Sequence, residues 1–593
     1  MRKKRATNEN FRLNILIGFF LSVSVVFVLR LFFIQVVGHE KYKALAQDQY
    51  WNLQDIPARR GNIMSRDGFV LATTQTHYLM YLEPQKIENK DKVIRYLSDA
   101  LVKINAEREG EADILKSGFE KKIANLLDTT LQWVILEHNL TPYQKEDIES
   151  LNLVGVGFEE EPVRYYPEGT LASHVLGFVA SNERGDKQGY EGIEGKLDAD
   201  LKGKPGRIVE EKDAMGAPIL VGGYTKVPPI NGRDIVLTLD RSVQYIIEKH
   251  IKNGVEMYDA VSGSVIVMDP TNGEVIAMAN YPTYDPANFT DEEKETTQSP
   301  HRKSLERKNL SISETYEPGS VMKPLTVSAA VDLKKVTLST SYEDYGPVYY
   351  SGHKIDNWDG KHHGTMNIVQ LLQKSNNIGA AWVGHLVGSE NLSEYMSNFG
   401  LGNKGGIDLE GEDTGILRDY SSWTDIDLAN IAFGQGISVT PLQMLDAFNT
   451  IANGGELFQP KVILEIRDEG KVLSIPPKNV RRVISKETSD TMVNMLIQAV
   501  EGGESKFFNL KDYKIAGKTG TAQIPVRGEY DPTKTNATFI GFLPETKKFS
   551  MIVRLDRPST SPYAAETAVP LWMSITDELV KYYGIPPDNT IGN

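Results

Sequence analysis

The sequence contains no cysteine among its 593 residues. A chain without thiols has no disulfide framework, no zinc site built from thiolates and no catalytic cysteine. Basic residues are also in deficit, because 65 Lys and Arg face 79 Asp and Glu and leave a formal net charge of −14. Nucleic acid recruits basic surfaces through its phosphates, so it is excluded as the expected partner. No internal repeat of roughly 20–50 residues is present, which excludes solenoid architectures.

One long apolar run lies near the N-terminus. Residues 13–29 carry no charge, are bounded by Arg12 and Arg30, and follow a basic cluster at residues 2–5. As a helix, this run spans roughly 26 Å, close to the hydrocarbon thickness of a bilayer. A second apolar stretch at residues 31–37 continues the helix. The pattern predicts a membrane anchor.

The positive-inside rule orients this anchor. We expect residues 1–12 to be a cytoplasmic tail, residues 13–37 to be the single transmembrane helix, and the remainder to lie outside the cell. A cleaved signal peptide is the alternative, since residues 44–46 (Ala-Leu-Ala) resemble a cleavage site. That site lies far beyond the apolar run, and the run is longer than a usual signal core. An uncleaved anchor is therefore favoured.

The part expected outside divides into two sections of different composition. Residues 38–230 are mixed, with a charged stretch at 87–127 whose apolar residues recur at helical spacing. This section ends in glycine- and proline-rich sequence at 222–223 and 228–232, a typical linker. A second domain is predicted from residue 234 onward.

Apolar strands are predicted at both ends of the second section, and helices in its middle. Residues 235–239, 264–268 and 274–278 precede the helical region at roughly 320–500, and residues 513–517, 537–542 and 549–555 follow it. Asn272-Gly273 between two of the strands is a strong hairpin signal. The arrangement predicts an α+β domain with a central antiparallel sheet and helices.

Three short motifs in this domain point to nucleophilic chemistry. Ser320-Val321-Met322-Lys323 follows Pro318-Gly319, and its spacing brings Ser320 and Lys323 onto one face at the start of a helix. The other two are Ser375-Asn376-Asn377 and Lys518-Thr519-Gly520-Thr521, the latter after a predicted strand. Ser-x-x-Lys, Ser-x-Asn and Lys-Thr-Gly in this order are the signature of penicillin-binding proteins and serine β-lactamases.

Other matches in the chain are weaker. Lys116-Ser117-Gly118 and Ser389-Glu390-Asn391 repeat two of the patterns, but neither has the order or the flanking elements of the set. Gly517-Lys518-Thr519 lacks the first glycine of a phosphate-binding loop. Three histidines precede the second motif without a metal-ligand spacing, so we expect a solvated loop and no metal; they are His353, His362 and His363.

Beyond the three motifs, the chain resembles the class B penicillin-binding proteins over most of residues 30–575. The similar segments are Arg60-Gly61-Asn62-Ile63, Arg66-Asp67-Gly68, Arg164-Tyr165-Tyr166-Pro167, His174-Val175-Leu176-Gly177, Gly192-Ile193-Glu194, Phe433-Gly434-Gln435-Gly436 and Thr440-Pro441-Leu442-Gln443. Tyr316-Glu317-Pro318-Gly319-Ser320 is more similar to the division-type (FtsI-like) branch than to the elongation branch. Residues 84–150 have no matching segment.

The resemblance implies an architecture and a reaction. An elongated pedestal (dimerisation-type) domain at 38–230 is expected to precede a serine β-lactamase-like transpeptidase domain at 234–585 and a tail at 586–593. The implied function is that of a peptidoglycan D,D-transpeptidase that cross-links stem peptides in septal cell-wall synthesis and is a target of β-lactams. The alternatives are an elongation-type transpeptidase and a non-catalytic β-lactam-binding scaffold or sensor. A β-lactamase and a carboxypeptidase are further rivals, separated by whether water resolves the acyl-enzyme.

The resemblance also implies roles for the motif residues. Ser320 is the expected nucleophile, Lys323 its base, Ser375 a proton carrier, and Asn377 a group that holds the substrate amide. The expected binding site for the terminal carboxylate is Lys518, Thr519, Gly520 and Thr521, and the backbone amides of Ser320 and Thr521 are the expected oxyanion hole. No cofactor is implied. The implied partners are peptidoglycan stem peptides, β-lactams, the cytoplasmic membrane, a membrane-embedded glycan polymerase of the FtsW type and other divisome proteins.

Overall fold

The computed structural model describes residues 6–43, 51–105, 112–211, 224–288, 305–526 and 529–588. These divide into two compact units, one of residues 1–59 with 203–231 and the other of residues 60–202 with 232–593. The basic cluster at 2–5, the Ala-Leu-Ala at 44–46, the glycines at 222–223 and most of the tail at 586–593 lie outside the described residues.

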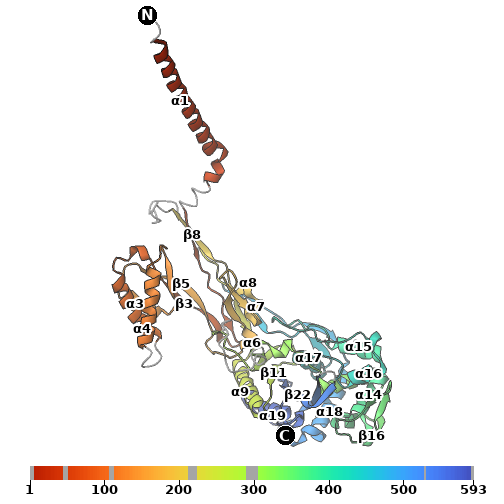
Figure 1. The fold of residues 1–593 in the computed structure, drawn as a ribbon. Helices are drawn as coiled ribbons and strands as arrows, with labels where there is room; N and C mark the ends of the chain where they lie inside the picture. The colour runs from red at the N-terminus through yellow and green to blue at the C-terminus, as the bar shows by residue number, and fades with distance from the viewer. Residues whose placement is uncertain are drawn as a thin grey trace. The chain divides into compact units, whose positions relative to one another are not determined.

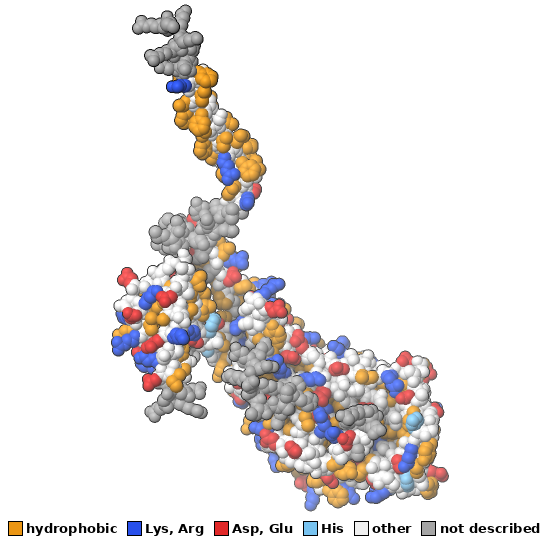
Figure 2. All heavy atoms as spheres, viewed as in Figure 1, with side chains coloured by type: hydrophobic (Ala, Val, Ile, Leu, Met, Phe, Trp, Pro, Cys, Tyr) orange, Lys and Arg blue, Asp and Glu red, His pale blue; other side chains and the backbone are white. Residues whose placement is uncertain are grey.

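The first unit contains the apolar helix and a small sheet. Helix α1 (Ala6–Phe32) continues into a short π-helix, η1 (Phe33–Val37). Apolar side chains cover most of the surface of Phe11–Val37, a stretch long and apolar enough to cross a membrane (Figure 2). The antiparallel sheet has the order β1-β8-β9, with bounds β1 (Trp51–Ile56), β8 (Gly206–Glu211) and β9 (Tyr224–Val227).

The second unit begins with a mixed sheet. Its strands are β2 (Ile63–Met64), β3 (Val70–Leu82), β4 (Val134–Leu140), β5 (Val156–Tyr165), β10 (Asp234–Leu237), β18 (Ile463–Asp468) and β19 (Lys471–Ser474). Strand β10 corresponds to the strand predicted at 235–239, but it pairs with β2 and β18 instead of joining the central sheet. That expectation was wrong because an apolar run predicts a buried strand without specifying its neighbour.

The stretch at 84–150 packs three helices against this sheet. They are α3 (Lys90–Asn105), α4 (Ala112–Leu127) and α5 (Pro142–Glu149), preceded by the 3-10 turn η2 (Pro84–Lys86). Leu97 and Leu101 of α3 and Ile123 of α4 are fully buried against Met80 and Leu82 of β3. The helical periodicity predicted at 87–127 is confirmed by α3 and α4, which lie side by side (Figure 1). These helices share a separate small core with β3 and β4.

Three of the segments that carried the family resemblance meet at one buried carboxylate. Glu194 is fully buried and accepts hydrogen bonds from Arg60 Nε at 2.5 Å and Arg164 Nε at 2.6 Å. A buried charge is tolerated only when it is paired and hydrogen-bonded, and here both partners are guanidinium groups. The short elements around this ion triad are α6 (Ser173–Leu176), β6 (Phe178–Ser181), β7 (Lys187–Tyr190), α7 (Gly192–Lys196) and α8 (Asp198–Leu201).

A five-stranded antiparallel sheet forms the centre of the C-terminal part, as predicted. Its order is β12-β11-β23-β22-β21, with bounds β11 (Ser262–Met268), β12 (Val275–Tyr281), β21 (Ala516–Val526), β22 (Glu529–Phe542) and β23 (Ser550–Asp556). Alternate residues face opposite sides. Val265 and Val267 pack toward α9 (Arg241–Met257) and α19 (Ala568–Tyr583), whereas Ile266 and Met268 join the helical core on the other side.

The helical middle predicted at 320–500 is also confirmed. Its helices are α12 (Lys323–Asp332), α13 (Ile368–Gln373), α14 (Asn377–Val387), α15 (Ser389–Asn398), α16 (Asp425–Ala432), α17 (Pro441–Ala452) and α18 (Lys486–Gly502), with the short 3-10 helices η3 (Gly319–Met322) and η4 (Tyr420–Ser422). The short helices α11 (Leu310–Ser313), η5 (Glu504–Phe507) and η6 (Ala564–Glu566) lie outside this range. Three two-stranded antiparallel sheets lie within the helical middle: β13 (Ser341–Asp344) with β16 (Gly364–Asn367), β14 (Val348–Tyr350) with β15 (His353–Ile355), and β17 (Glu456–Phe458) with β20 (Asn479–Arg482).

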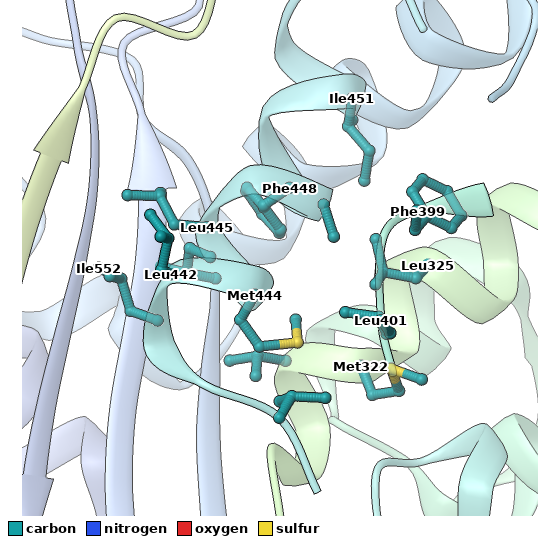
Figure 3. Close-up of a cluster of buried hydrophobic side chains, with 14 of the residues drawn as sticks. Met322, Leu325, Phe399, Leu401, Leu442, Met444, Leu445, Phe448, Ile451 and Ile552 are labelled. Atoms are coloured by element: carbon teal, nitrogen blue, oxygen red, sulfur yellow. The ribbon is translucent and has the colours of Figure 1, made fainter. Parts of the chain in front are cut away.

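The start of α12 is anchored in this core. Met322 and Leu325 are fully buried, and Figure 3 shows them beside Leu401 and facing Met444 of helix α17. Helix α17 is itself buried along its whole length. Because protein interiors are close-packed, this contact fixes the position of the turn that precedes α12.

Candidate active site

The three predicted motifs converge on one cavity. Lys323 Nζ lies 2.9 Å from Ser320 Oγ and 2.8 Å from Asn377 Oδ1. Lys518 Nζ donates a hydrogen bond of 3.0 Å to Ser375 Oγ. The sequence-predicted side chains are thus linked from Ser320 through Lys323 and Ser375 to Lys518.

Ser320 stands on a tight turn. It lies in η3, directly before Lys323, the first residue of α12. Gly319 has φ +58° and donates its backbone N–H to the Gly434 carbonyl. Gly434 has φ +88°, and a Cβ on it would lie 2.1 Å from the Gly319 carbonyl oxygen, so only glycine fits against this turn. The segment at 433–436 therefore supports the turn that presents Ser320.

Strand β21 lies along the other side of the turn. It is the edge strand of the central sheet and contains Lys518-Thr519-Gly520-Thr521, whereas the sequence placed the motif after a strand at 513–517. That boundary was wrong because β-propensity does not distinguish an edge strand from the loop next to it. A Cβ on Gly520 would lie 2.9 Å from Val321 Cγ1 and 3.0 Å from the Pro318 carbonyl, so glycine permits the close approach of β21.

The surroundings of Lys323 favour its neutral form. Its side chain is fully buried, and burial together with the positive charge of Lys518 holds its pKa well below the usual value, against an opposing effect of Glu504. A neutral amine has two N–H bonds and one lone pair. The Ser375 carbonyl at 2.5 Å and Asn377 Oδ1 at 2.8 Å can accept both protons. The lone pair is then directed at the Ser320 hydroxyl, the geometry of a general base.

Lys518 has the opposite requirement, because a ligand carboxylate needs a cation. Burial lowers the pKa of Lys518 to about 8, while the charge of Glu504 raises it. Its Nζ also donates to the carbonyl and hydroxyl oxygens of Thr519, each at 3.0 Å. Two buried lysines with different surroundings thus provide one base and one cation, the pattern expected of paired catalytic groups.

The cavity around these groups has a volume of about 610 Å³, within the usual range of ligand sites. Ser320, Ser375, Asn377, Thr519 and Thr521 all line it. Two partly exposed aromatic rings lie on its wall, Trp358 and Tyr563, with their centroids 5.5 Å apart in an edge-on contact. These rings could not be predicted from the sequence, since they come from loops that are far apart in the chain.

A buried carboxylate behind the second motif also escaped sequence analysis. Asp344 accepts hydrogen bonds from the side chains of Asn357 at 3.1 Å and Asn376 at 2.8 Å, and lies 3.0 Å from His362 Nδ1. Asn357 Oδ1 in turn accepts the backbone N–H of Asn377. This network holds the loop that carries Ser375, whose φ of +52° is unusual for a residue other than glycine.

Asn377 has both ends of its amide engaged. Its Oδ1 contacts Lys323, and its Nδ2 donates to the Asp356 carbonyl at 3.0 Å. In this arrangement Asn377 orients the base, and its expected contact with the substrate amide stays a prediction.

The weaker motifs lie away from this cavity. Lys116 is on α4 and pairs with Asp99 at 2.6 Å, and Ser389 begins helix α15. Among the residues that the structure describes, no group of three or more His, Asp or Glu side chains is arranged to hold a metal ion. His353 is exposed, and His362 contacts Asp344.

Comparison with known proteins identifies two regions of the chain. Residues 263–576 match the family described as penicillin binding protein transpeptidase domain, and residues 55–237 match the penicillin-binding protein dimerisation domain. Stage V sporulation protein D from Bacillus subtilis (strain 168) is 31% identical, over 98% of this chain and 88% of the relative. Peptidoglycan D,D-transpeptidase FtsI from Escherichia coli (strain K12) is 27% identical, over 99% of this chain and 95% of the relative. The crystal structure of penicillin binding protein 2X from Streptococcus thermophilus superposes with a TM-score of 0.74 at 26% identity, covering 89% of this chain and 80% of that one.

Proposed function

Because this chain belongs to the penicillin-binding protein transpeptidases, it is a serine-type peptidoglycan D,D-transpeptidase, and we propose that Ser320 is its nucleophile. The observation that carries the proposal is the distance of 2.9 Å between Ser320 Oγ and the buried Nζ of Lys323. A serine hydroxyl is a weak nucleophile and needs an adjacent base. Lys323, held neutral by its burial, is that base.

In the first half-reaction, Ser320 Oγ attacks the carbonyl carbon between the two terminal D-alanines of a stem peptide, and its proton passes to Lys323. The C–N bond then breaks, the leaving amine takes up a proton through Ser375, and D-alanine departs. Ser375 suits this role because its hydroxyl oxygen accepts from Lys518 at 3.0 Å, so its own proton is available to the amine. The product is an acyl-enzyme on Ser320.

In the second half-reaction, the amine of a neighbouring stem attacks the acyl carbon. The ester bond to Ser320 Oγ breaks, a peptide cross-link forms, and the proton lost by the amine returns to Ser320 through Lys323. The backbone N–H groups of Ser320 and Thr521 stabilise the oxyanion in both steps. Their location supports this role, since Thr521 is on the edge strand β21 beside the turn of Ser320. Each donor contributes about 3–4 kcal/mol in serine enzymes.

The substrate binding site follows from the same geometry. The binding site for the terminal carboxylate of the stem peptide is formed by Lys518 and the edge strand at 519–521, and Asn377 keeps Lys323 oriented. β-Lactams occupy the site as mimics of the D-alanyl-D-alanine end, and acylate Ser320 through their strained amide. The relatives named as penicillin-binding proteins support this assignment.

Domain limits and membrane topology complete the proposal. Residues 13–37 are the transmembrane anchor, with 1–12 in the cytoplasm and the pedestal (38–230) and transpeptidase domain (234–585) outside. The apolar surface of Phe11–Val37 and the basic cluster before it support this orientation. The anchor allows contact with a membrane-embedded glycan polymerase of the FtsW type and with other divisome proteins. Co-purification of such a polymerase with the full chain, lost when 13–37 is exchanged for an unrelated anchor, tests that contact.

The cellular site we propose is the division septum. The relatives named FtsI support it, as does Glu317 before Pro318-Gly319. A fluorescent fusion is expected at midcell before constriction ends, whereas uniform label along the lateral wall contradicts a septal role. Label confined to sporulating cells favours the role named for the Bacillus subtilis relative.

A transfer assay tests the reaction. The full chain in detergent is mixed with a synthetic stem peptide ending in D-alanyl-D-alanine and an acceptor amine. We expect one D-alanine released for each cross-linked product, and neither from Ser320→Ala. Release of D-alanine without cross-linked product, at saturating acceptor, indicates a carboxypeptidase instead.

A further inference from the structure

An acidic side chain lies in the cavity that is expected to bind a carboxylate. Glu504, on η5, lines the cavity, and its side chain is partly buried. Its Oε2 accepts a hydrogen bond of 2.9 Å from the Thr519 hydroxyl. Like charges repel, so a carboxylate at this position has to be explained by what it does to the groups around it.

The first of these groups is the Thr519 hydroxyl. A hydroxyl has one proton to donate. That of Thr519 goes to Glu504, and its oxygen accepts from Lys518 Nζ at 3.0 Å. With Glu504 ionised, Thr519 has no proton left for a ligand carboxylate.

Thr521 differs from Thr519 in this respect. Its hydroxyl oxygen accepts the backbone N–H of Ala564 at 3.1 Å, which leaves its proton available. Thr521 also lines the cavity and is partly exposed to it. Of the two threonines of the motif, Thr521 is therefore the one able to donate to an anionic ligand.

The second group is Lys518, whose charge depends on the charged side chains around it. Among the described residues these neighbours are Lys323 on α12 and Glu504 on η5. Helix α18 carries its charged side chains on its exposed side, and they are Lys486, Glu487, Asp490 and Glu501. Element η3 has no charged residue, and Ile540 of β22 is the cross-strand partner of Lys518. Glu566 of η6 accepts a hydrogen bond from Ser561 instead.

We propose that Glu504 is a positioning residue that keeps Lys518 cationic and engages the proton of Thr519, so that Lys518 and Thr521 hold the ligand carboxylate. The inference rests on the proposed function of Ser320 and assigns a division of labour within the same site. Among the described residues, Glu504 is the anion whose charge raises the pKa of both buried lysines, Lys323 and Lys518. It thereby opposes the loss of charge that burial favours. It does so without an ion pair that would compete with the ligand for Lys518, because Thr519 lies between them.

The test is the pH dependence of acylation by benzylpenicillin on the full chain. In Glu504→Gln the amide oxygen still accepts from Thr519, but the negative charge is gone. The alkaline decline of the second-order rate constant is expected to move to lower pH by about one unit, a tenfold loss at pH above the wild-type midpoint. In Glu504→Asp, which keeps the negative charge, the midpoint is expected to return most of the way to the wild-type pH. The matched control is Glu501→Gln on the exposed side of α18, for which we expect no shift.

A second comparison separates the two threonines. Benzylpenicillin is compared with its neutral methyl ester at pH 6.5, where Lys518 is protonated. We expect Thr521→Val to slow acylation by the anion about tenfold and by the ester less than threefold. Thr519→Val is expected to slow both probes by the same factor.

The outcomes are distinguishable. Covalent labelling with an unmoved alkaline decline in Glu504→Gln overturns this inference and leaves Ser320 as the nucleophile. Selective loss of the anionic probe in Thr519→Val also overturns it. Absence of any labelling of the wild-type chain overturns the proposed function and this inference together.

Discussion

Lys323 Nζ lies 2.9 Å from Ser320 Oγ, and two carbonyl oxygens take up the protons of its amine. This arrangement needs no rearrangement before proton transfer. Position and protonation state are fixed by the same feature, the burial of Lys323 at the start of α12.

The first prediction concerns the base. Lys323→Arg keeps a positive charge at the site, but a guanidinium group does not deprotonate in proteins. We expect the rate of acylation by a fluorescent penicillin to fall by about 10²–10⁴, the usual contribution of a general base. Retention of more than a tenth of the wild-type rate contradicts the assignment. Lys374→Arg, at an exposed position beside the second motif, is the control.

The second prediction concerns pH. Neutral Lys323 is required, so the acylation rate rises as pH increases through the lowered pKa of Lys323. Cationic Lys518 is also required, and its charge is lost as pH rises through about 8. The profile of the second-order rate constant is therefore expected to be bell-shaped, with its alkaline midpoint near pH 8. A rate that still rises between pH 8 and 10 is inconsistent with a cationic role for Lys518.

The third prediction concerns the turn that presents Ser320. In Gly434→Ala the new Cβ meets the Gly319 carbonyl oxygen, so the turn has to move. We expect acylation to slow at least tenfold, because small displacements of a nucleophile are costly. Gly470 offers a matched control, with φ +85° and no atom within 4 Å of an added Cβ. Equal effects of Gly434→Ala and Gly470→Ala would show that backbone strain alone accounts for the loss.

The fourth prediction concerns the buried ion triad. Glu194→Ala leaves the buried guanidinium group of Arg164 without its carboxylate partner, and leaves Arg60 paired only with Asp198 at 2.7 Å. We expect the free energy of unfolding in urea to fall by about 3–5 kcal/mol. Glu149→Ala removes an exposed pair with Lys145 and is expected to cost less than about 1 kcal/mol. Similar losses for the two variants contradict a structural role for the triad.

The parts that could be predicted from the sequence are those with local signatures. Ser320 and Lys323 are three residues apart at the start of a helix, and Asn272-Gly273 turns β11 into β12, so short-range geometry was sufficient. The three motifs are far apart in the sequence, so their prediction as one site assumed that the fold brings them together. The helices at 87–127 were predictable from their apolar periodicity even without a family resemblance.

What escaped prediction depends on tertiary contacts. Glu504 and Asp344 sit in segments without a motif, and their roles come from Thr519 and Asn376, which are distant in sequence. Strand β10 is apolar enough for any buried sheet, and only the structure identifies β2 and β18 as its partners. Arg60, Arg164 and Glu194 each lie in a segment that resembles the family, but the sequence did not indicate that the three side chains meet.

The fifth prediction is the central one, that Ser320 forms the acyl-enzyme. The full chain is incubated with a fluorescent penicillin, digested, and the modified peptide is located by mass spectrometry. We expect a single lasting adduct on Ser320, and no labelling of Ser320→Ala. An adduct on another residue, or labelling that persists in Ser320→Ala, would contradict the account.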